Sequence, residues 1–303
     1  MRGIIQDVVL CERQFVMKKS SGNIQKPSSY LSVGIAVSCV LAVIIAVGYF
    51  FAMKNGYNFT IGHFDPTVWF FLLAGGVVAA LVLSVVMALP FGKYTAAVKE
   101  TTVSESILRV VAAVPGVAVF ALFVIGVISH TTERSTLGDI AGVLSVFIPI
   151  ALLLPVFCGR KKISAFVTIL AVLGVNLAVF SSYFDFTLAI NNPVRNLMTV
   201  ARCALLLFFI SEARFLLPDD SERFSVRFAL FVNFFSFTAL SGISLGAALY
   251  RITANNPADP SENIAWLALF FAVSLVSLVR ILGIRKTICE KHDDNDTITD
   301  KGE

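Results

Sequence analysis

The chain has 303 residues, of which 57% are hydrophobic and 15% are charged, and its formal net charge is +4. Soluble domains carry about 25% charged residues, so a water-soluble globule of this composition could not cover its surface with polar groups. The charges lie in short runs beside long apolar stretches and form no basic stripe on a soluble domain. We therefore exclude nucleic acid as a partner and expect these cations to contact anionic lipids.

A transmembrane helix needs about 20 mostly apolar residues. Eight stretches meet this requirement, and they are residues 30–53, 67–91, 108–129, 138–157, 164–184, 197–217, 227–250 and 264–284. Turn-forming Gly, Pro, Asn and Asp mark several of the short connections between them. The sequence therefore predicts an all-α fold, a polytopic bundle of about eight transmembrane helices.

The bundle divides the chain into three regions. Residues 1–29 precede the first span, residues 30–284 form the eight-helix transmembrane domain, and residues 285–303 form a tail that turns acidic. We do not expect the first region to be a signal peptide, because the apolar run that follows it is too long and lacks a small-residue cleavage site. Met17-Lys18-Lys19 resembles a bacterial start just before a first span, so we expect residues 1–16 to be an over-called start.

Lys and Arg predict the orientation of the bundle. If the N-terminus is cytoplasmic, 19 of these cations fall on the inner side, Arg109 and Arg280 among them, while Arg202 lies within a span. The outer side then holds four cations, which are Lys54, Arg134, Arg195 and Arg251. The positive-inside rule therefore predicts that both termini are cytoplasmic in a multi-pass protein of the cell membrane.

No known catalytic motif stands in the context that its chemistry needs. The sequence lacks HExxH, a Walker loop and any assembled Ser/His/Asp set. Residues 242–246 read Gly-Ile-Ser-Leu-Gly, but this GxSxG match lies inside an apolar span and not at the strand-to-helix turn of a nucleophile elbow. The histidines are predicted in loops or the tail, and the five cysteines show neither metal-ligand spacing nor a disulfide framework. We expect no enzymatic activity, no metal and no cofactor.

Ionisable residues inside a bilayer are costly and are therefore the first functional candidates. The sixth span carries Arg202 near its outer end and Glu212 near its inner end, about 15 Å apart along the helix axis at 1.5 Å per residue. Asp185, at the outer end of the fifth span, is the expected partner of Arg202. Glu212 is expected to meet a cation such as Arg214 or one from another helix. Structural ion pairing and a transport role both remain open.

The fifth and seventh spans carry uncharged polar residues at mid-membrane positions. Asn176 lies at the middle of the fifth span. In the seventh, four residues fall on one side of the helix: Asn233, Ser236, Ser241 and Ser244. Gly242 and Gly246 lie opposite and form a GxxxG pattern that lets another helix backbone approach closely. The polar side is expected either to hydrogen-bond across helices or to line a hydrated cavity.

One part of the chain resembles a known group. Residues 183–185, 190–193 and 206–215 resemble uncharacterised polytopic membrane proteins from clostridial Firmicutes. The resemblance is limited to the fifth and sixth spans, and that group has no established activity. It implies a bacterial cytoplasmic membrane and draws attention to Asp185, Glu212 and Arg214.

Two classes of function follow from these features. The first is a non-catalytic membrane component, such as a sensor, a scaffold or a subunit of a membrane complex. The second is a carrier or channel for a small solute or lipid, with a cavity lined by Asn176, Asn233 and the serines of the seventh span. The expected partners are the lipid bilayer and, in the first case, other membrane subunits or a second copy of the chain.

Overall fold

A computed structural model describes residues 27–58, 63–65, 67–92, 95–97, 102–129, 136–158, 162–184, 193–217, 223–253 and 263–299. The predicted over-called start at residues 1–16 and the candidate Asp185 lie outside these ranges.

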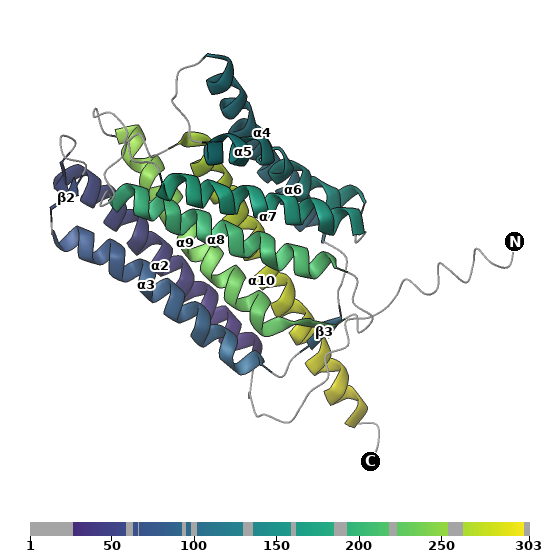
Figure 1. Ribbon diagram of the computed structural model, residues 1–303. Coiled ribbons are helices and arrows are strands. Elements are labelled where there is room, and N and C mark those ends of the chain that lie inside the picture. The colour runs from purple at the N-terminus through teal and green to yellow at the C-terminus, as the bar shows by residue number, and fades with distance from the viewer. Residues whose placement is uncertain are drawn as a thin grey trace, which may run out of the picture.

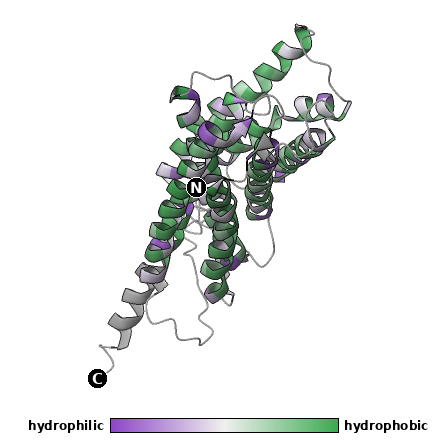
Figure 2. Cartoon of the chain, turned by 90° about the vertical axis from the view of Figure 1, so that its left-hand side faces the viewer, coloured by the Kyte–Doolittle hydropathy of each residue, from purple (hydrophilic) through white to green (hydrophobic). Residues whose placement is uncertain are grey.

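The described residues form the predicted all-α polytopic bundle (Figure 1). Its helices are α2 (Pro27–Gly56), α3 (Val68–Ala88), α4 (Val103–Ile128), α5 (Thr136–Leu144), α6 (Phe147–Phe157), α7 (Lys162–Tyr183), α8 (Pro193–Leu216), α9 (Val226–Thr253) and α10 (Ile264–Thr299). A 3₁₀ turn, η1 (Leu89–Phe91), extends α3, and α5 with α6 makes one span. Eight spans in these ranges are long and apolar enough to cross a membrane, which confirms the predicted fold class. Figure 2 shows hydrophobic residues along most of their length.

Two short antiparallel ladders connect helix ends. β1 (Tyr57–Asn58) pairs with β2 (His63–Phe64) between α2 and α3, and β3 (Thr95–Ala97) pairs with β4 (Arg223–Ser225) ahead of α4 and α9. We call the end at which α4 and α9 begin the inner end. It is the end that the charge pattern predicts to be cytoplasmic.

The third and fourth spans differ in detail from the sequence expectation. The helix α4 begins five residues before the predicted start at 108, because the Thr102 side chain caps it by accepting a 3.2 Å hydrogen bond from the backbone N–H of Glu105. The fourth span is broken into α5 and α6 at Ser145 and Val146. Pro149 sits in the first turn of α6, where a missing N–H costs no intrahelical bond.

The helix α9 lies at the centre of the bundle. It packs against α2, α3, α8 and α10 and is buried over most of its length (Figure 1). Gly242 and Gly246 lie against α2, where a β-carbon added to Gly246 would stand 2.6 Å from Tyr49 Cβ and 2.8 Å from the Ala46 carbonyl oxygen. These glycines therefore allow the backbones of α9 and α2 to approach closely.

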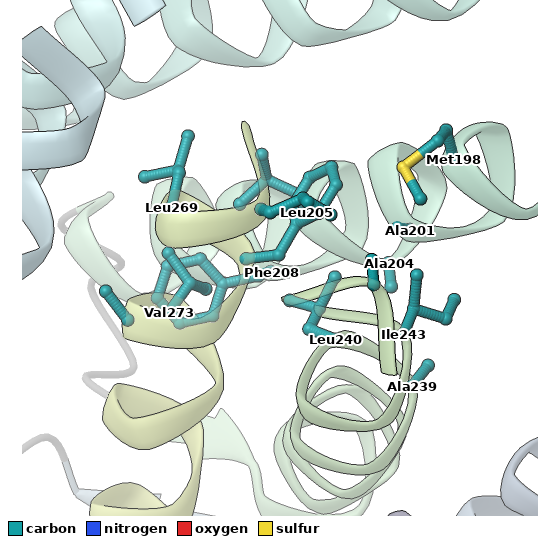
Figure 3. Packing of buried hydrophobic residues seen from close by; sticks show 14 of the residues in the cluster. Met198, Ala201, Ala204, Leu205, Phe208, Ala239, Leu240, Ile243, Leu269 and Val273 are labelled. Atoms are coloured by element: carbon teal, nitrogen blue, oxygen red, sulfur yellow. The ribbon is translucent and has the colours of Figure 1, made fainter. Parts of the chain in front are cut away.

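The helices α10, α4, α6, α7 and α8 contact one another in that order. Figure 3 shows apolar side chains of α8, α9 and α10 meeting between these helices, among them Leu205, Phe208, Leu240 and Val273. The contact between α8 and α10 is short compared with their contacts to α9. The inner ends of α4, α8 and α10 are joined by charged side chains.

Candidate functional site

Four charged side chains meet at the inner end of the bundle. Glu105 and Arg109 come from α4, Glu212 from α8 and Arg280 from α10, and we call these four residues the charge cluster. Glu105 and Arg109 share a face of α4 because four residues separate them. Glu212 lies one turn before the end of α8. The cluster is therefore built near the inner ends of three apolar spans, a few residues inside each.

The four groups alternate in sign and form a closed set of ion pairs. Arg109 donates from Nε and Nη2 to Glu105 Oε1 at 3.1 and 2.9 Å, and from Nη2 to Glu212 Oε2 at 2.5 Å. Arg280 donates from Nε to Glu105 Oε1 at 2.8 Å and from Nη1 to Glu212 Oε1. Each carboxylate thus binds both arginines, and the net charge of the cluster is zero.

The cluster is removed from solvent. Arg109 is 0% exposed and Glu212 is 1% exposed. The Arg280 guanidinium lies 5.8 Å from the ring centre of Phe208 and 5.1 Å from that of Phe215, both on α8. Buried charges need partners, because the desolvation of each ion costs several kcal/mol in a protein interior. The pairs within the cluster supply those partners and tie α4 to α8 and α10.

Glu212 and Arg214 have different roles in the structure. The expected partner of Glu212 was Arg214 or a cation from another helix, and the structure places two arginines of other helices beside it. Arg214 is exposed and lies over the Phe228 ring at 5.5 Å. Of the two expected alternatives, the structure shows a cation from another helix and not Arg214. The reason is geometric, since residues two apart on a helix point in different directions.

Arg202 lies outside the charge cluster. Its guanidinium stands 5.4 Å from the centre of the Trp266 ring on α10, and its Nε has no hydrogen-bond partner among the described residues. Asp185, its predicted partner, falls outside the described ranges. Asn176 is partly buried on α7.

The polar residues of α9 are buried and most are bonded within their own helix. Asn233 Nδ2 donates to the Ala229 carbonyl at 2.8 Å, and the hydroxyls of Ser241 and Ser244 donate to carbonyls four residues earlier, each at 2.5 Å. Ser236 alone of the four reaches another helix, donating to the Ala204 carbonyl of α8 at 3.1 Å. The expected cross-helix bonding is therefore wrong for Asn233, Ser241 and Ser244, because a short polar side chain in a helix reaches its own backbone more easily.

Sequence reasoning missed three members of the charge cluster. Glu105 fell outside the predicted third span, and Arg109 and Arg280 were counted as orientation signals. One signal was available: Thr102 and Glu105 have capping-box spacing, and Arg109 follows Glu105 by one turn. That pattern predicts that the helix begins before residue 108 and that Glu105 and Arg109 form an ion pair.

Within the described ranges, no group of three or more His, Cys, Asp or Glu side chains is placed to hold a metal ion. Cys39, Cys158 and Cys203 are free thiols.

Comparison of the chain with models of protein families, with curated proteins and with solved structures finds no match. The eight apolar spans among the described residues nevertheless show what kind of protein this is. The chain is an integral, multi-pass membrane protein. Its outward apolar side chains contact a lipid bilayer, since lipid is the solvent that such faces require.

Proposed function

We propose that this protein is a non-catalytic membrane component, a sensor or a subunit of a membrane complex, whose charge cluster holds the inner ends of α4, α8 and α10 together and releases them on a signal. The observation that carries the proposal is the cluster itself. Four buried charges are retained where apolar side chains of similar volume would often stabilise the fold as well or better. Charges kept at such a place favour a switchable junction over a passive one.

The helix contacts support a junction that can open. The helices α4 and α10 pack along one another, and α7 packs along α8, whereas α8 meets α10 only briefly. The Arg109–Glu212 pair joins α4 to α8 by side chains. Loss of these pairs would leave each helix packed against its other neighbours.

The polar side of α9 favours this role over a carrier. A solute path along α9 would need unpaired polar groups facing water at mid-membrane depth. The hydroxyls of Ser236, Ser241 and Ser244 are buried and bonded to backbone carbonyls. The Oδ1 of Asn233 has no partner among the described residues, but Asn233 is 1% exposed and so does not face water. We therefore favour the component over a carrier or channel. We place it in the bacterial cytoplasmic membrane, with both termini cytoplasmic, on the cation pattern and the resemblance to clostridial proteins.

The proposal is tested in two assays with one set of variants. A deletion strain is complemented with wild type, Glu212→Gln and the control Ser241→Ala, with membrane levels measured by immunoblot. We expect Ser241→Ala to restore growth and envelope integrity fully and Glu212→Gln to fail at an equal protein level. Full rescue by Glu212→Gln would make the cluster dispensable and would contradict the proposal.

The second assay separates a component from a carrier. Purified protein in liposomes is challenged with gradients of small neutral solutes, amino acids and salts, and swelling is followed by light scattering. We expect the same rates with and without protein. A protein-dependent rate that Glu212→Gln abolishes or raises would replace the component with a carrier or channel.

A further inference from the structure

Among the residues that the structure describes, four hydrogen-bond donors around the charge cluster have no partner. They are Arg109 Nη1, Arg280 Nη2 and the hydroxyls of Ser211 and Ser277. All four side chains are nine-tenths buried or more. A buried donor without an acceptor costs about 1–3 kcal/mol, so native proteins rarely leave one, and a group of four calls for a bound acceptor.

The helix positions bring these donors to one junction. Ser211 lies on α8 between Phe208 and Phe215, three residues after the first and four before the second, so it shares the stripe whose rings flank Arg280. Ser277 lies three residues before Arg280 on α10 and shares its face. The two arginines bind the same carboxylates, which holds their guanidinium groups together.

Ser38 Oγ on α2 and Thr67 Oγ1 ahead of α3 also lack a partner among the described residues, but other buried hydroxyls have one. Ser84 and Thr168 donate to carbonyls four residues earlier at 2.6 and 2.8 Å, and Ser274, one turn before Ser277 on α10, donates to the Phe271 carbonyl at 2.6 Å. A serine in a helix commonly bonds its own backbone. Ser211 and Ser277 make no such bond in the structure.

Charge at the inner end selects the class of ligand. The free atoms include two guanidinium nitrogens, which repel a cation and suit the oxygens of phosphate. Further cations stand at the same end, and those with described side chains are Arg214, Arg227, Arg285 and Lys286. Of the acids with described side chains there, Glu105 and Glu212 are already paired. The local field therefore attracts an anion.

We propose that the inner end of the bundle binds a phosphate group between α4, α8 and α10, held by Arg109 Nη1, Arg280 Nη2, Ser211 Oγ and Ser277 Oγ. The inference rests on the proposed function and deepens it by naming the chemical class of the ligand that would act on the charge cluster. A bound phosphate takes up the free donors and competes with Glu105 and Glu212 for both arginines. The phosphate comes either from the headgroup of an inner-leaflet phospholipid or from a soluble phosphate.

The test removes donors while keeping the ion pairs. Ser211→Ala/Ser277→Ala deletes two hydroxyls that bond nothing else, so the fold is retained. The matched controls are Ser274→Ala and Ser241→Ala, whose hydroxyls already bond backbone carbonyls. Binding of inorganic phosphate is measured by calorimetry in detergent at constant ionic strength. Binding of phosphatidylglycerol is measured by native mass spectrometry, with phosphatidylcholine as the reference lipid.

We expect the double variant to weaken binding of one probe about tenfold or more, and each control to bind as wild type does. Weaker binding of phosphatidylglycerol alone assigns the site to lipid, and weaker binding of inorganic phosphate assigns it to a soluble ligand. Binding of neither probe to wild type, or equal binding by the double variant, overturns the inference and leaves water as the acceptor. The complementation result for Glu212→Gln is independent of this outcome, so failure of the ligand is distinguished from failure of the junction.

Discussion

Glu212 is the residue on which the charge cluster depends most. It accepts hydrogen bonds from arginines of two other helices while itself being buried. Replacing it leaves two guanidinium groups with one carboxylate between them, and an uncompensated buried charge costs several kcal/mol.

Glu212→Ala is expected to lower the free energy of unfolding by about 3–5 kcal/mol. Arg214→Ala, two residues away on the exposed surface of α8, is the matched control and should change it by about 0.5 kcal/mol or less. Denaturant unfolding in mild detergent, followed by tryptophan fluorescence, measures both. Equal stability of the two variants would mean that the cluster does not hold the fold.

The pair between α4 and α8 can be isolated by a double-mutant cycle. Arg109→Met and Glu212→Gln each strand a charged partner, whereas the double variant removes one charge of each sign. We expect the double variant to be more stable than the sum of the single effects predicts, by about 0.5–3 kcal/mol. Additive effects would show that Arg109 and Glu212 do not interact.

Sequence reasoning found one member of the cluster and missed the others. The cost of a charge in lipid was enough to select Glu212, and a partner from another helix was one of two alternatives. Arg109 and Arg280 were counted among the inner-side cations that predict the orientation of the bundle. Only the packing of α4 against α10 turns both arginines toward the same carboxylates. Sequence spacing within one helix cannot show that arrangement.

At the scale of elements, the backbones of α9 and α2 approach closely at two glycines at the centre of the bundle. A β-carbon on Gly246 would meet the Ala46 carbonyl oxygen at 2.8 Å, and one on Gly242 would meet the Ala42 carbonyl oxygen at 3.0 Å. Backbone atoms cannot rotate away as side chains do, so the helices themselves would have to separate.

Gly246→Ala is expected to destabilise the protein by about 1–3 kcal/mol, the usual cost of overpacking. Gly75→Ala on α3 is the control, because nothing lies within 4 Å of its added β-carbon. Alanine should be neutral there or stabilise the helix by up to about 1 kcal/mol. Thermal unfolding in detergent compares the two, and a stable Gly246→Ala variant would contradict the close approach.

The elements themselves were predictable because apolar length dominates in a membrane chain. The seventh span carries two unlike faces, one polar and one of small residues, and α9 lies at the centre of the bundle. Two details needed the structure. The first is the cap at Thr102, which extends α4. The second is the break between α5 and α6, which brings the Leu144 carbonyl oxygen close to Gly174 on α7. A β-carbon added to Gly174 would lie 3.0 Å from that oxygen. These two features depend on a local hydrogen bond and on neighbouring backbone. The spacing of apolar residues does not predict either of them.

At the scale of the whole molecule, the orientation in the membrane is a prediction from cations alone. Tyr57→Cys lies between α2 and α3, and Gly92→Cys lies after η1 at the opposite end. In a background without the native cysteines, we expect an impermeant maleimide added to intact cells to label residue 57 and to spare residue 92 until the cells are opened. The reverse pattern would place the charge cluster at the outer face and remove the predicted topology.

The central claim is that the charge cluster holds the inner end of α4 to that of α8. Val103, at the start of α4, is 77% exposed, and Leu217, at the end of α8, is 48% exposed, so both accept spin labels without entering the core. Double electron–electron resonance between these positions, in a background without native cysteines, measures the separation of the two helix ends. The account predicts one narrow distance in the parent protein and in Arg214→Gln, and a longer, broader distribution in Glu212→Gln. An unchanged distribution in Glu212→Gln would contradict it.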